Sequence, residues 1–233
     1  LLLLFFILVG AGALAQQQPF FETLTEKDGL SDNRVTCFLK DRTGFLWVGT
    51  KNGLNRYNGY DFSVFVPVKN SISNELINDI EEDKDGFIWV STMNGLNRYH
   101  PVKKTWQRYE ALGVDTPRIL LNPIVWDSYI DDDNKLWLAT DFQGISVFDT
   151  KTQTFTHYPW KRIIPQLLPQ YKGRYFSVLK ILPKTNHELW LATTFGLVVF
   201  NKVTGKYTVA GHGYETYSLE MIYNQTQRKV FIT

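Results

Sequence analysis

Short stretches of alternating apolar and polar residues run along this chain, and turns rich in Gly, Asp and Asn separate them. The clearest set comprises residues 76–82, 87–92, 96–100 and 105–109. A hydrophobic period of two over such short stretches predicts β-strands, and no stretch shows a long helical period. The pattern therefore predicts an all-β protein.

The strand pattern repeats along the chain. Residues 44–57 recur as residues 86–99 with three of the fourteen positions changed, and two weaker copies follow. The tryptophans Trp47, Trp89, Trp137 and Trp190 occupy one position of the repeat, at spacings of 42, 48 and 53 residues. Periods of ~40–50 residues with several strands each are typical of propeller blades. We therefore expect a β-propeller of four-stranded antiparallel blades, here an incomplete arc of about four to five blades. The expected repeats are residues 33–66, 75–110, 120–158, 175–209 and a partial repeat at 218–233.

The repeated tryptophans are expected to pack one blade against the next, because a single sheet cannot bury both of its faces. The turns between the second and third strands carry glycines, where a positive φ is expected. These glycines are Gly53, Gly95, Gly144 and Gly196.

The first part of the chain differs from the rest. Residues 1–15 are apolar and uncharged and end in Ala13-Leu14-Ala15, which predicts a secretory signal peptide whose start is truncated. A buried helix or a membrane anchor is the alternative. The mature, exported propeller would occupy residues 16–233, with residues 20–25 as a lone outer strand. Because the last residues read as a strand without a cap, we expect the chain to be a fragment.

Composition narrows the possible functions. Hydrophobic residues make up 44% of the chain and charged residues 21%, so it can bury a core. A formal net charge of +2 argues against a dedicated nucleic-acid-binding protein. The single Cys37 excludes an internal disulfide framework and a multi-cysteine zinc site. We expect no cofactor.

The amino-acid sequence of residues 28–33 and 41–62 resembles the two-component regulator propeller repeat. The resemblance implies the periplasmic sensor region of a Bacteroides-type hybrid histidine kinase, so this segment itself is not expected to be an enzyme. It also implies an oligosaccharide from a complex glycan as ligand. Further propeller blades and a kinase region would follow in the same chain, and the full receptor would be a homodimer in the inner membrane.

Catalytic and metal-binding patterns are weak. The four histidines lie at unrelated repeat positions, and no paired metal-ligand spacing is present. The acidic runs at 81–85 and 131–133 lack the spacing of a calcium loop, so turn-capping aspartates are the favoured interpretation. No catalytic residue and no metal ligand is therefore predicted.

Propeller topology brings the turns between second and third strands, and the connections between blades, to one face. Amides, charges and aromatic rings there suit a hydroxyl-rich ligand, although each could be an ordinary turn residue. A longer connection at residues 159–174 is either a binding lip or a covering loop. The ligand candidates are Arg34, Asn52, Asn94, Asp141, Phe142, Trp160, Arg162, Arg174, Tyr175 and Phe195. An exported polysaccharide-active enzyme and a scaffold or adhesion propeller remain alternative functions.

Overall fold

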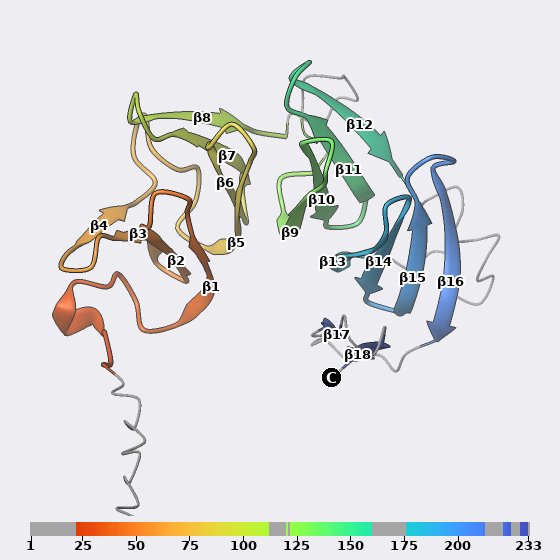
Figure 1. Ribbon diagram of the computed structural model, residues 1–233, viewed down its shortest axis with the longest axis horizontal. Coiled ribbons are helices and arrows are strands. Elements are labelled where there is room, and N and C mark those ends of the chain that lie inside the picture. Colours follow the sequence, from red (N-terminus) through yellow and green to blue (C-terminus); the bar gives the residue numbers. More distant parts are fainter. Residues whose placement is uncertain are drawn as a thin grey trace, which may run out of the picture.

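The computed structural model describes residues 22–111, 120, 122–159, 176–212, 221–224 and 229–232. Its strands form four antiparallel four-stranded sheets and one two-stranded sheet. The sheets stand side by side in an arc, like blades around an axis (Figure 1). The prediction of an all-β propeller is therefore confirmed. Within the described residues, no helix is long and apolar enough to cross a membrane.

Each blade follows a simple meander in which consecutive strands pair. The first blade contains β1 (Val35–Lys40), β2 (Leu46–Thr50), β3 (Gly53–Tyr57) and β4 (Phe62–Phe65). The second contains β5 (Ile77–Glu82), β6 (Ile88–Thr92), β7 (Gly95–His100) and β8 (Thr105–Tyr109). The third contains β9 (Val125–Ile130), β10 (Lys135–Thr140), β11 (Gly144–Asp149) and β12 (Thr154–Tyr158). The fourth contains β13 (Val178–Thr185), β14 (Glu188–Thr193), β15 (Gly196–Asn201) and β16 (Lys206–His212). The fifth sheet has β17 (Met221–Asn224) and β18 (Lys229–Ile232).

Two expectations at the edges of the blades differ from the structure. Strand β16 runs to His212, three residues past the expected end of the fourth repeat. Residues 22–25 are not a strand. Instead Thr25 caps a short 3-10 turn, η1 (Glu26–Asp28), because its hydroxyl accepts a hydrogen bond from the amide of Lys27.

The first strands of the blades, β1, β5, β9 and β13, lie innermost and contact one another in sequence order (Figure 1). The hydrophobic core is divided into clusters that lie between neighbouring blades. Each cluster contains one repeated tryptophan that touches an aromatic ring of the next blade. The pairs are Trp47 with Tyr99, Trp89 with Phe148 and Trp137 with Phe200, at ring-centroid distances of 5.4, 5.1 and 5.7 Å.

Trp190, the fourth tryptophan of the repeat, is only partly buried. Lys184 places its ammonium group 5.1 Å from the centre of this ring. Its environment therefore differs from that of the three fully buried tryptophans.

The glycines of the second turn have the backbone conformation that the sequence predicts. Gly53, Gly95, Gly144 and Gly196 have φ values of 124°, 106°, 93° and 135°. A side chain at Gly95 would also place its Cβ 2.8 Å from the carbonyl oxygen of Tyr109. Both the positive φ and the close approach thus require glycine there.

Candidate functional site

One face of the arc is formed by the turns between second and third strands. In every blade the amide of a residue in this turn donates a hydrogen bond to the segment that leads into the first strand. Lys51 donates to the carbonyl of Arg34, and Met93 donates to that of Leu76, at 3.2 and 3.3 Å. Asp141 and Thr194 make the corresponding bonds at 3.2 Å. These hydrogen bonds hold the turns in place on the face where the sequence predicts the ligand-binding residues.

The candidates of the first two blades are polar and make local contacts. The guanidinium of Arg34 pairs with Asp32 at 2.5 Å and lowers the pKa of that carboxyl to about 2. The side-chain amide of Asn52 lies 3.4 Å from the carbonyl oxygen of Ser31. Asn94 is exposed at the equivalent turn. All three lie on the predicted face, Arg34 and Asn52 in the first blade and Asn94 in the second.

A denser polar group lies on this face in the third blade. The Asp141 carboxylate accepts a hydrogen bond from the indole of Trp126 at 3.2 Å and another from the hydroxyl of Ser177 in the fourth blade. Phe142 follows with a φ of 56°, and 44% of its side chain is exposed. Asp141 is thus fixed across a blade interface beside an exposed aromatic ring.

Phe195 corrects one expectation. Its side chain is 2% exposed and packs edge-to-face against Phe176, with ring centroids 4.7 Å apart. Its ring therefore belongs to the core between the third and fourth blades and is not exposed on the predicted face. Trp160, Arg162, Arg174 and Tyr175 lie outside the described residues.

A second polar cluster lies where the innermost strands meet. Asp79, Asp127 and Lys180 occupy equivalent positions of β5, β9 and β13. Each aspartate bonds to the next blade: Asp79 accepts from the amide and hydroxyl of Ser128 at 3.0 and 2.6 Å. Asp127 accepts from the amide of Ile181 at 2.7 Å and from Lys180 Nζ at 2.8 Å. The cluster therefore joins three blades.

The charges of this cluster are unbalanced. Burial raises the pKa of Asp79 and of Asp127, and the charge of Asp79 raises the pKa of Asp127 further. The ammonium of Lys180 offsets part of both shifts. Burial, with repulsion from both aspartates, raises the pKa of Glu81 to about 8. Burial and the charge of Asp79 also raise the pKa of the Cys37 thiol to about 12, so it stays protonated. Among the described residues, no group of three or more His, Cys, Asp or Glu side chains is placed so that it could hold a metal ion.

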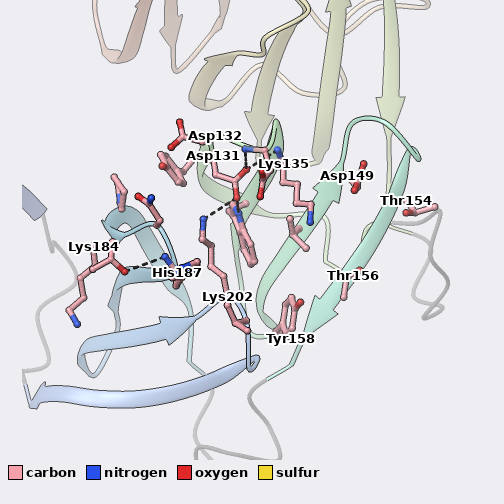
Figure 2. A pocket seen from close by; sticks show the side chains of 18 residues that line it. Asp131, Asp132, Lys135, Asp149, Thr154, Thr156, Tyr158, Lys184, His187 and Lys202 are labelled. Carbon is pink, nitrogen blue, oxygen red and sulfur yellow. Dashed lines mark hydrogen bonds and ion pairs between the residues drawn. The ribbon is translucent and has the colours of Figure 1, made fainter.

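A groove on the opposite face lies between the third and fourth blades (Figure 2). Its volume is about 850 Å³, within the ~300–1,000 Å³ range of small-molecule sites. The third blade contributes side chains from β10, β11 and β12, and the fourth contributes the turn between β13 and β14. Lys202 reaches across the groove to Asp131, with 3.1 Å between Nζ and Oδ2 (Figure 2).

Asp131 is fixed at the base of this groove. Burial alone would raise its pKa, but hydrogen bonds from the Trp137 indole, from the amide of Lys135 and from Lys202 lower it below the usual value. The carboxylate is therefore ionised and held in place. The sequence predicts that the aspartates of residues 131–133 lie in a turn, but it does not reveal the groove beside them.

Two segments of the chain, residues 29–52 and 71–94, match the family model described as "Two component regulator propeller". These two segments are similar to two-component regulator propeller repeats. Each matched segment covers the first two strands of its blade, in the first and second blades, where the sequence repeat is also strongest.

Similar proteins include a histidine kinase and the extracellular domain of a putative hybrid two component system. Histidine kinase P4 from Formosa agariphila is 42% identical over 52 residues, which are 22% of this chain and 4% of the kinase. The extracellular domain of the putative hybrid two component system BT3049 from B. thetaiotaomicron is 25% identical, with a TM-score of 0.76. That alignment covers 91% of this chain and 29% of the extracellular domain. The chain thus spans only a small part of each relative.

Propeller enzymes are less similar to this chain. Virginiamycin B lyase from Staphylococcus aureus is 18% identical with a TM-score of 0.55, over 77% of this chain and 56% of the lyase. That similarity shows the fold alone. The prediction that this segment is not an enzyme agrees with its greater similarity to the extracellular domain of a putative hybrid two component system.

Proposed function

We propose that this chain is the N-terminal sensor propeller of a two-component receptor and that it passes a binding signal to a histidine kinase in the same polypeptide. The main support is the similarity to the extracellular domain of a hybrid two component system over 91% of the chain. A ligand that binds one arrangement of the receptor more tightly shifts the equilibrium toward it. The propeller would therefore act through differential affinity, without chemistry of its own.

The proposed location is the periplasm, in the ectodomain of an inner-membrane receptor. The apolar residues 1–15 and their Ala-Leu-Ala ending support export. These residues lie outside the described part of the chain. The full receptor would act as a homodimer, so that ligand binding could change the relation between two kinase regions.

The proposed ligand is an oligosaccharide from a complex glycan. Support comes from the polar and aromatic character of the described surfaces, above all the Asp141 and Phe142 turn and the groove beside Asp131. Hydroxyl-rich ligands need such a mixture of donors, acceptors and ring surfaces. No part of this proposal requires a cofactor.

A genetic experiment tests the proposed function. A strain lacking the full-length gene and its parent are grown on purified polysaccharides, and their transcripts are compared. We expect the deletion to abolish the response to one polysaccharide, and the wild-type gene to restore it. An unchanged response to every polysaccharide contradicts the proposal. Degradation of a polysaccharide by the purified full-length protein would instead support an exported enzyme.

A further inference from the structure

The blades differ in what covers the repeated tryptophan. In the first blade the guanidinium of Arg56 lies 3.5 Å from the centre of the Phe45 ring and 5.6 Å from that of Trp47. In the second blade Arg98 lies 3.5 Å from the Phe87 ring and 5.2 Å from the Trp89 ring. A stacked Phe–Arg pair therefore fills the space beside the tryptophan in both blades.

The third blade replaces both members of this pair. Lys135 lies two residues before Trp137, where the first two blades have phenylalanine. Val147 pairs with Trp137 across the strands, as the arginines do with their tryptophans. A lysine and a valine cannot form the stack, and both line the groove between the third and fourth blades. The groove thus occupies the space that the Phe–Arg pair fills in the first two blades.

The walls of the groove offer many uncharged hydrogen-bonding groups. The hydroxyls of Thr154 and Thr156 and the ring of Tyr158 project from β12, as Figure 2 shows. The turn of the fourth blade adds the amide of Asn186 and the imidazole of His187. Hydroxyls and amides both donate and accept, which suits a ligand with many hydroxyl groups.

The charged groups of the groove largely compensate one another. Lys202 pairs with Asp131 at 3.1 Å, and Lys184 pairs with Glu188 at 2.7 Å. The Asp149 carboxylate accepts two backbone amide hydrogen bonds. Four carboxylates and three ammonium groups line the groove, from Asp131, Asp132, Asp133, Asp149, Lys135, Lys184 and Lys202. The lining therefore offers a strongly acidic ligand no net positive charge, whereas a neutral ligand meets no such penalty.

We propose that the groove between the third and fourth blades binds a neutral, hydroxyl-rich oligosaccharide segment and disfavours acidic ones. This inference rests on the proposed sensor function and adds a location and a charge class to its ligand. The location is the face opposite the turns on which the sequence placed its candidates.

The double variant Lys135→Phe with Val147→Arg tests the site, because it restores the residues that close this space in the first two blades. A matched control makes the same changes on the exposed turn after β7, as Val102→Arg with Lys103→Phe; Val102 is 86% exposed. A second pair of variants, Thr156→Ala and Asn186→Ala, removes wall groups without filling the groove. All are made in the full-length protein, and thermal unfolding checks the fold of each.

Binding is measured first on an array of neutral and acidic oligosaccharides and then by calorimetry with cellohexaose, xylohexaose, mannohexaose and hexagalacturonate. We expect wild type and control to bind a neutral hexasaccharide, and the groove-filling variant to bind at least 30-fold more weakly. Loss of one wall hydrogen bond should weaken binding about 3–10-fold.

The other outcomes separate this inference from the proposed function. Unchanged binding in a folded groove-filling variant overturns the site but leaves the sensor proposal standing. Binding of acidic oligosaccharides alone, or of no neutral oligosaccharide on the array, overturns the charge class. Failure of the proposed function would appear separately, as a transcript response that survives deletion of the gene.

Discussion

The indole Nε1 of Trp137 donates a hydrogen bond of 2.8 Å to Oδ2 of Asp131, six residues earlier in the same blade. The other oxygen of this carboxylate accepts hydrogen bonds from the amides of Asp133 and Lys135. One aspartate thus joins the first hairpin turn of the blade to the tryptophan that packs on the next blade. The same 2.8 Å pair recurs as Asp41 with Trp47 and Asp83 with Trp89.

We expect Asp83→Ala to lower the free energy of unfolding by about 2–4 kcal/mol, because it leaves the buried Trp89 indole N–H and two turn amides without their acceptor. Urea unfolding of the full-length protein measures this change. Asp61→Ala, at an exposed turn, serves as the control and should change stability by less than ~0.5 kcal/mol. Equal losses in both variants would contradict a structural role of the aspartate–tryptophan pair.

A comparison of two glycines separates backbone strain from crowding. Gly95 and Gly59 have similar φ values, 106° and 99°, but no atom lies within 4 Å of a Cβ built at Gly59. Gly59→Ala should therefore cost about 1–2 kcal/mol from the left-handed backbone alone. Gly95→Ala should cost about 1–3 kcal/mol more, because its Cβ would meet the carbonyl of Tyr109. Thermal unfolding distinguishes the two, and equal losses would rule out the crowding.

The contact between Asp127 and Lys180 predicts a non-additive pair of substitutions. Lys180→Met removes one hydrogen bond from the buried Asp127 carboxylate and keeps the one from the Ile181 amide, and should cost about 1–3 kcal/mol. Adding Asp127→Asn should recover part of this loss, since an amide oxygen can still accept from Ile181. A double-mutant cycle in chemical denaturation measures the coupling, and additive effects would contradict it.

Lys184→Met is the matched control for that cycle. Lys184 also pairs with a carboxylate, that of Glu188, but both side chains are about 30% exposed. Exposed ion pairs contribute ~0.2–1 kcal/mol, so this variant should lose much less stability than Lys180→Met.

The strands could be predicted from the sequence because their period of two is local. The strands predicted at residues 76–82 and 87–92 are found at Ile77–Glu82 and Ile88–Thr92 in the structure. Phe195 was placed wrongly, because a turn position does not reveal that Phe176 draws its ring into the core. The direction of a single side chain depends on the neighbouring blade.

The groove escaped prediction for a related reason. The sequence does contain its signal, since Lys135 and Val147 stand where the first two repeats have phenylalanine and arginine. The two differences can be interpreted only with the strand register, which places the arginine opposite the tryptophan and against the phenylalanine ring. An alignment of the repeats shows that these two residues differ. Only the packing of the third blade against the fourth shows that the difference leaves a groove.

The raised pKa of Glu81 predicts how the free energy of unfolding depends on pH. Burial, followed by repulsion from Asp79 and Asp127, raises its pKa from 4.5 to about 8, while Lys180 offsets part of this. A carboxyl with a raised pKa stabilises the fold fully below its unfolded value, and this stability is lost as the pH rises through the folded value. Unfolding should therefore become easier between about pH 4.5 and pH 8.

In Glu81→Gln the free energy of unfolding should fall by roughly 2 kcal/mol less over this pH range than in the wild type, because the amide does not ionise. The measurement is the urea midpoint of the full-length protein at pH 5 and pH 8, with Glu110→Gln at an exposed position as the control. The control should keep the wild-type slope. If Glu81→Gln keeps it too, the carboxyl is ionised in the fold throughout this range, and the excess negative charge between the innermost strands is neutralised by other groups.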